Sequence, residues 1–473
     1  MMRRFILFDL LLPIIVVAGM AQYGRAAYSV IVSGQVPLWQ LNSDLLISAG
    51  PLRYIKDAVV AGISIAWLIT LPRLPLSRRV ARFVRVYFVW LAIVMSLGLV
   101  GFLLNYSPLF FLPAGLRWIL LLHASFGVFV LSSTLAWRQS GHKFVYWFLV
   151  ASLLIDTYIV QIQFGRSAGL FGLAFGESRL TGLFSMAAVA GYFALAVALF
   201  AWQLDRVGWK MRMLITLWCL VLALSTGSRF ATLAIVLVIV GQSWELMGRV
   251  GSRSRRFLKL FLVPLAAVVL FVSYQAVMVQ VGRGDAIAQQ FDEGGRAANL
   301  FEVAGMLSTA DAGELLFGRG LGIGTNTART AVISTRTNPS QYRFNILIDN
   351  AFATAFFQFG LLGSIVFWFG VWKFLAFARP AHPGHEKNRY LVVLVIVIVS
   401  LFAGNPFEQF FLMMAFASSV GSVYGSTRPA YVRLEDRKSL VLPPGQSAAG
   451  SRQAIAAVGV NHPSLQYDRG QVT

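Results

Sequence analysis

Residues 86–104 read VYFVWLAIVMSLGLVGFLL, a run without one charged side chain. An α-helix rises about 1.5 Å per residue, so a run of this length crosses the roughly 30 Å hydrocarbon core of a bilayer. Similar runs recur along the chain, which is 57% hydrophobic and 12% charged, with a mean hydropathy of +0.70. Soluble proteins are far less apolar. The sequence therefore predicts an all-α polytopic membrane protein.

We expect about twelve transmembrane helices, which form one integral membrane domain over residues 1–425. The apolar runs lie near residues 5–22, 55–71, 86–104, 115–136, 144–163, 181–202, 211–225, 230–247, 260–280, 350–372, 390–404 and 407–424. One long polar loop, residues 281–346, separates the ninth span from the tenth. Residues 426–473 are rich in Pro, Gly, Ser and Gln without periodicity, so they predict a disordered tail.

The distribution of positive charge predicts the orientation of these spans. With the N-terminus in the cytoplasm, every inward loop is basic, and these loops and the tail hold most of the 40 lysines and arginines. This pattern agrees with the positive-inside rule. Both termini are then cytoplasmic, and residues 281–346 lie on the outer face. The net charge of +21 is largely a topology signal and does not indicate nucleic-acid binding.

The outer loop is the first place to look for chemistry, because loops longer than about 15 residues are usually functional or disordered. Apolar residues at near-helical spacing in residues 296–316 predict an amphipathic helix on the membrane surface. Residues 318–324, GRGLGIG, lack the preceding strand and the Gly-Lys-Ser/Thr ending of a phosphate loop. We interpret them as a turn in which glycines allow positive φ angles and close backbone approach.

Several arginines remain on the outer face, where membrane insertion does not require them. They include Arg117, Arg179, Arg229, Arg296 and Arg319. The guanidinium group binds phosphate and carboxylate bidentately and keeps its charge when desolvated. An anionic ligand outside the cytoplasm explains these residues. The alternative is snorkelling, in which a long side chain near a span end reaches the lipid headgroups.

Two carboxylates lie within or beside predicted spans, Asp156 and Glu408, and pairing with outer arginines is the simplest account of both. The single cysteine, Cys219, lies inside an apolar run and offers no disulfide or cysteine-based metal site. His382 and His385 lack further ligands for zinc. We expect no metal and no cofactor.

Six short motifs resemble, in order, those of the O-antigen ligase and polymerase superfamily of bacterial inner-membrane enzymes. They are RLTGLF at residues 179–184, TGSR at 226–229, Arg296, GRGLG at 318–322, Asp349-Asn350, and GLLG at 360–363. The resemblance covers residues 50–425 and includes a large periplasmic loop late in the chain. Each motif alone is weak, and their order carries the specificity.

The resemblance implies a GT-C-like glycosyltransferase that takes an undecaprenyl-diphosphate-linked glycan as donor and a second glycan as acceptor. Its chemistry would be inverting and independent of metal, with a flippase and a chain-length regulator as partners in the inner membrane. The diphosphate-binding residues would be Arg179, Arg229, Arg117 and Arg319. The catalytic residues would be Asp349 and Arg296, of which Arg296 also suits the diphosphate, with Asn350, Ser228 and Glu177 in support. Cations beside a leaving group stabilise the charge that develops on it.

One departure from the family pattern separates its branches. O-antigen ligases have a functional histidine near the end of the loop, where this chain has Asp349-Asn350. This favours a polymerase of O-antigen or exopolysaccharide repeat units over a ligase that transfers to lipid A core. Asp349 would orient or deprotonate the acceptor hydroxyl, or it would cap the tenth helix. A flippase or transporter of lipid-linked oligosaccharide is the alternative from another class.

Overall fold

The computed structural model describes residues 2–21, 54–74, 76, 78–134, 142–168, 183–184, 187–247, 296–325, 348, 350–380 and 385–426. These residues are mostly helical and include no strand. The chain divides into two compact units, Met1–Thr427 and Arg428–Thr473. The tail expected to be disordered lies outside the described residues.

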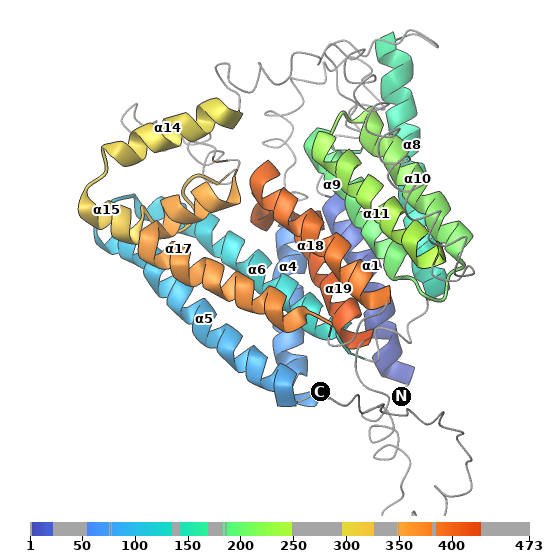
Figure 1. Ribbon diagram of the computed structural model, residues 1–473, viewed down its shortest axis with the longest axis horizontal. Helices are drawn as coiled ribbons and strands as arrows, with labels where there is room; N and C mark the ends of the chain where they lie inside the picture. Colours follow the sequence, from blue (N-terminus) through green and yellow to red (C-terminus); the bar gives the residue numbers. More distant parts are fainter. Residues whose placement is uncertain are drawn as a thin grey trace, which may run out of the picture. The chain divides into compact units, whose positions relative to one another are not determined.

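The described helices are labelled in chain order (Figure 1). They are α1 (Met2–Ala21), α4 (Ile55–Thr70), α5 (Arg78–Leu103), α6 (Leu112–Ser132), α8 (His142–Ala168), α9 (Ala187–Gln203), α10 (Trp209–Ser225), α11 (Arg229–Met247), α14 (Arg296–Ser308), α15 (Ala312–Phe317), α17 (Ala351–Ala378), α18 (His385–Ala403) and α19 (Phe410–Ser426). Short 3-10 turns are η2 (Leu71–Arg73), η3 (Leu109–Phe111) and η7 (Pro406–Glu408). A helix lies at every predicted span except the ninth, residues 260–280, which is outside the described part.

In the part of the chain that the structure describes, four helices are long and apolar enough to cross a membrane. They are Arg79–Leu103, Leu109–Ser132, Lys143–Ile162 and Ala351–Ala378. Large apolar side chains on their outer surfaces are exposed, for example Val89 (62%), Trp147 (63%) and Ile365 (59%). Such surfaces suit a lipid environment. These are the features of an all-α protein embedded in a membrane.

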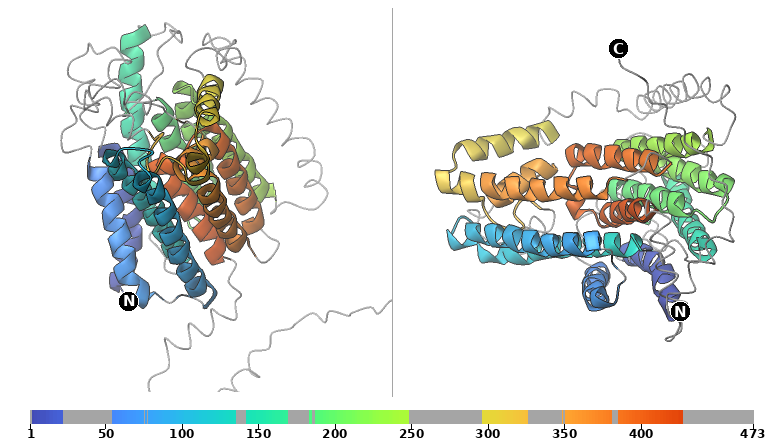
Figure 2. Two further views of the ribbon diagram at one scale, coloured as in Figure 1. Left: turned by 90° about the vertical axis from the view of Figure 1, so that its left-hand side faces the viewer. Right: turned by 60° about the horizontal axis from the view of Figure 1, so that its bottom comes forward.

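The packing places α6 in the interior and α5 and α17 at the periphery. Helix α6 packs on α4 and α19, while α5 and α17 run side by side (Figure 1 and Figure 2). Most of α6 is buried, and aromatic rings fill the space around it: Phe126 stacks on Tyr87 at 3.6 Å and Phe129 meets Phe374 at 4.8 Å between centroids. Helices α9, α10 and α11 form a second group, which α19 and α18 join to the first.

Helix α17 is broken at Gly360, where φ is 62° and ψ is −167°. Its first part folds back on its second, since Phe352 stacks on Trp368 with ring centroids 4.3 Å apart. In one continuous helix these residues would be about 24 Å apart. The tenth predicted span is therefore a short half-helix followed by a longer one, because a glycine inside an apolar run lets the chain reverse.

The glycine-rich segment 318–324 fills the break. The amides of Arg319 and Gly320 donate to the carbonyls of Phe357 (2.9 Å) and Gln358 (3.1 Å), which end the half-helix. Gly318, at φ 77°, meets the backbone of Gly360 so closely that a Cβ on either would overlap the other's chain. The predicted turn with positive φ and close backbone approach is confirmed.

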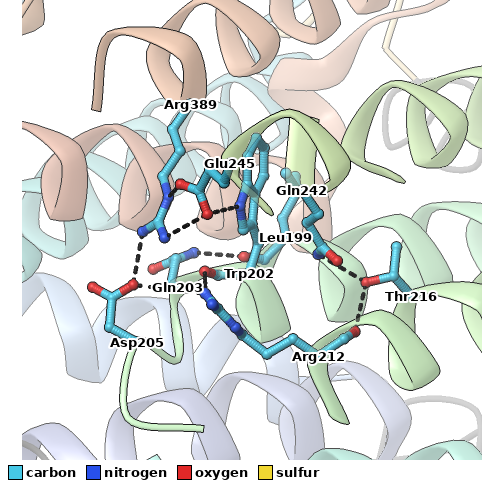
Figure 3. A network of polar contacts seen from close by, with 9 residues as sticks. All are labelled: Leu199, Trp202, Gln203, Asp205, Arg212, Thr216, Gln242, Glu245 and Arg389. Atoms are coloured by element: carbon cyan, nitrogen blue, oxygen red, sulfur yellow. Dashed lines mark hydrogen bonds and ion pairs between the residues drawn. The ribbon is translucent and has the colours of Figure 1, made fainter. Parts of the chain in front are cut away.

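An ionic network, buried except at Asp205, joins α9, α10, α11 and α18 (Figure 3). Arg389 forms a bidentate ion pair with Glu245 and a second pair with Asp205 at 2.9 Å. Arg212 donates to the carbonyl of Trp202 at 3.2 Å and lies 3.7 Å from Asp205. In the predicted orientation this network lies at the cytoplasmic end of the helices, opposite the outer arginines.

Candidate functional site

Two cations and two carboxylates gather where α4 and α6 begin and η7 lies. Arg117 Nε donates to Asp57 Oδ1 at 2.8 Å, with both side chains about one third exposed. The ammonium of Lys56 interacts electrostatically with Arg117, Asp57 and Glu408. Asn405 Nδ2 donates to Glu408 Oε1 at 2.8 Å. We call Lys56, Asp57, Arg117, Asn405 and Glu408 the charged cluster.

The N-terminus of α17 adjoins the charged cluster. The amide of Ala351 donates to the carbonyl of Gly404 at 3.2 Å, one residue before Asn405. The first amides of a helix carry partial positive charge, which favours an anion nearby. The Oδ1 atom of Asn405 is buried and accepts no hydrogen bond from the described residues.

Asn350, a predicted supporting residue, is the N-cap of α17. Its side chain accepts hydrogen bonds from the amides of Phe352 and Ala353, each at 3.0 Å. Asn350 therefore occupies the N-cap position that was considered for Asp349. Asp349 itself lies outside the described residues. Its neighbour Ile348 donates its amide to the carbonyl of Gly324 at 3.0 Å.

Arg319, a diphosphate candidate, is held by partners within the protein. Its Nε pairs with Glu314, and its guanidinium lies 4.6 Å from the centroid of the Phe357 ring. The carbonyl of Arg319 accepts the hydroxyl of Ser107. Both charged side chains are largely buried, at 13% and 15% exposed. These contacts assign Arg319 to fixing the glycine segment on α5, α15 and α17.

Removal of either partner of this pair should destabilise the fold. We expect R319Q and E314Q each to lower the free energy of unfolding by about 1–3 kcal/mol, because a buried charged group loses its hydrogen bond. The double variant should cost less than the sum of the two. Thermal unfolding of the four proteins in detergent micelles measures this coupling. An R319Q protein as stable as the unchanged chain would show that the pair is not structural.

Arg229 has a different environment, as the first residue of α11 after the turn at Gly227 (φ 61°). It is half-buried, no acidic residue lies in the first turn of α11, and no carboxylate among the described residues pairs with it. A cation at the positive end of a helix is unfavourable unless an anion is near. The side chain of the neighbouring Ser228 packs so closely on Gly191 of α9 that a Cβ at Gly191 would overlap it. This close packing holds the turn against α9.

Most of the remaining predicted site residues have no described side chain. Arg179 and Glu177 lie outside the described residues, and Arg296 is the first residue of α14, without a described side chain. Asp156 accepts the amide of Leu183 at 2.7 Å, so it anchors the end of the RLTGLF motif on α8. The amide takes one acceptor position of the carboxylate and leaves others, so the pairing of Asp156 with an outer arginine stays a prediction.

The structure thus divides the arginines among three places: Arg117 in the charged cluster, Arg319 in the glycine segment, and Arg229 at the α10–α11 turn. Sequence reasoning gave no site role to Lys56, Asp57 and Asn405. Their positions in the sequence could have singled them out. Lys56-Asp57 lies at the start of one predicted span, and Asn405 lies in the short gap between the last two.

Comparison with known proteins found no matching family model, no matching curated protein and no matching solved structure. Within the described residues, no group of three His, Cys, Asp or Glu side chains is placed to hold a metal ion. The fold and the site define an all-α membrane protein with charged side chains gathered where several helices begin.

Proposed function

We propose that this protein is a glycosyltransferase of the bacterial inner membrane that polymerises undecaprenyl-diphosphate-linked oligosaccharide units at the periplasmic face. The observation that carries the proposal is the charged cluster, with two cations, two carboxylates and the capped N-terminus of a half-helix. Ionisable side chains within membrane-spanning segments often mark substrate sites. A lipid diphosphate offers both the anion and the apolar chain that this environment suits.

The proposed reaction needs a cationic site and a proton acceptor. Arg117 and Lys56 would bind the diphosphate and stabilise the negative charge that grows on it as the glycosidic bond breaks. The acceptor hydroxyl attacks the anomeric carbon from the opposite face and gives its proton to a carboxylate. The products are a lengthened lipid-linked glycan and free undecaprenyl diphosphate, with inverted configuration at the anomeric carbon.

Asp349 is the proposed proton acceptor, and the N-cap of α17 is Asn350. We expect D349N to lose at least 100-fold of polymer synthesis at normal protein level, as is typical when a general base is removed. The matched control is Asn350→Asp, which keeps an N-cap oxygen and should retain synthesis. Full synthesis by D349N would exclude the base role.

The glycan made by a strain that lacks the gene tests the function itself. Single repeat units on the surface indicate a polymerase. Full-length polymer that stays on its lipid carrier indicates a ligase to lipid A core, the alternative within the enzyme class. Repeat units trapped on the cytoplasmic face contradict both.

A flippase for the same lipid-linked glycan is the second candidate, and the broken helix α17 favours it. Discontinuous helices form the substrate sites of many transporters. The ionic network of Arg389 would then be an inner gate that must open in each cycle. Transport of a fluorescent lipid-linked oligosaccharide across proteoliposomes without change in glycan length would support this function over the first.

A further inference from the structure

An apolar cavity of about 340 Å³ lies between α5, α6, α17, α18 and α19. Its walls include Tyr87, Phe126, Phe374 and Phe407, and almost all of its surface is apolar. On one side it is bordered by side chains that face outward, among them Val89 (62% exposed) and Phe369 (55%). In a membrane-embedded bundle such a side faces lipid tails. The cavity therefore opens toward the bilayer.

One end of the cavity is positively charged. Lys373 lines it, and the ammonium lies 5.1 Å and 4.9 Å from the ring centroids of Phe369 and Trp372. Arg79 lies 5.1 Å over Phe377, whose ring stacks at 4.0 Å on the cavity residue Phe83. We call Arg79 and Lys373 the basic rim.

The basic rim has no acidic counterpart on its own helices. Residues 78–103 and 351–378 contain no Asp or Glu, and no carboxylate among the described residues pairs with Lys373. Its aromatic contacts leave N–H donors free for an anion. In the proposed orientation this is the cytoplasmic end, because α5 begins and α17 ends there. Basic pockets between helices on that side bind the headgroups of anionic lipids.

We propose that the cavity binds one acyl chain of an anionic glycerophospholipid from the cytoplasmic leaflet, with the phosphate held by Lys373 and Arg79. The charge selects the headgroup, and the apolar wall accepts the chain without selecting its length. The lipid would join α5 and α17 to α18 and α19 on the cytoplasmic side of η7. The basic rim shares no residue with the charged cluster, and the proposal does not depend on glycosyl transfer.

Native mass spectrometry of the full-length protein in mild detergent tests the site, with phosphatidylglycerol and phosphatidylcholine of the same chains as probes. We expect several-fold more phosphatidylglycerol adduct than phosphatidylcholine adduct, and K373Q should remove that preference. The matched control is K210Q, because Lys210 is also exposed over a tryptophan ring, Trp209 at 6.0 Å, but does not line the cavity. An equal loss in K210Q, or no preference in the unchanged protein, would overturn the proposal.

A second pair of variants tests the cavity itself. Val86→Trp fills the wall at a half-exposed position, and Val221→Trp adds the same bulk on α10, away from the cavity. V86W should lose phosphatidylglycerol adducts at an unchanged unfolding temperature without lipid, and V221W should retain them. Undecaprenyl phosphate is the third probe. If V86W loses undecaprenyl phosphate but keeps phosphatidylglycerol, the cavity holds an isoprenoid chain and the proposal fails.

Discussion

Replacing Arg389 by Gln should lower the free energy of unfolding by about 3–5 kcal/mol, the usual cost of breaking a buried ion pair by removing one partner. Glu245, whose side chain is 10% exposed, would lose the bidentate pair and keep only the indole of Trp202 at 3.4 Å. Asp205 would keep Arg212 at 3.7 Å. Because the network joins α9, α10, α11 and α18, its loss should affect the whole bundle (Figure 3).

Thermal unfolding in detergent micelles, followed by tryptophan fluorescence, measures this effect. The matched control is Lys387→Gln, which removes one positive charge from an exposed position on the same helix. Surface charges contribute little, so K387Q should stay within about 0.5 kcal/mol of the unchanged protein. Equal stability of R389Q and K387Q would show that the network contributes nothing to the fold. Increased transport with R389Q would instead favour the flippase.

Gly360→Ala should cost roughly 2–5 kcal/mol, from a positive φ angle in an L-residue and from steric overlap. The added Cβ would meet the carbonyl group of Leu316 and the amide of Gly318, and backbone atoms cannot move aside as a flexible side chain does. The half-helix would separate from the glycine segment, and the amides of Arg319 and Gly320 would lose their acceptors. We expect the start of α17 to move away from the charged cluster.

The control for this variant is Gly62→Ala, because a Cβ at Gly62 in α4 meets nothing within 4 Å. Alanine is the better helix former, so G62A should be neutral or slightly stabilising. Limited proteolysis of the outer segments, together with the unfolding temperature, compares the two variants. Unchanged protection of residues 296–325 in G360A would mean that the chain reverses at α17 without help from this glycine.

The positions of the helices could be predicted because each is a long apolar run, and the length needed to cross a bilayer is fixed. The positive φ angles of the GRGLGIG segment could be predicted because alternate glycines have few other uses. The break in α17 could not, since Gly360 stands in an apolar run like those of unbroken spans. The fold-back becomes visible only through long-range contacts such as Phe352 with Trp368.

In the candidate site too, some features could be predicted from the sequence and others could not. Arg117 and Arg229 could be singled out because a charge at the edge of an apolar run is conspicuous. The partners of Arg117 could not be assigned, because the adjacent pair Lys56-Asp57 and the residue Glu408 are far from it in the sequence and meet it only through packing. The internal pairing of Arg319 with Glu314 was also hidden, although the two residues are only five positions apart.

The central claim is that the charged cluster binds a lipid diphosphate for glycosyl transfer. The most direct measurement uses the purified full-length protein in proteoliposomes with an undecaprenyl-diphosphate-linked repeat unit, followed by mass spectrometry of the lipid-linked products. We predict products of two or more repeat units together with free undecaprenyl diphosphate, and a loss of both in R117Q and K56Q but not in K387Q. Repeat units that cross the bilayer without growing, or growth that persists in R117Q and K56Q, would contradict the account.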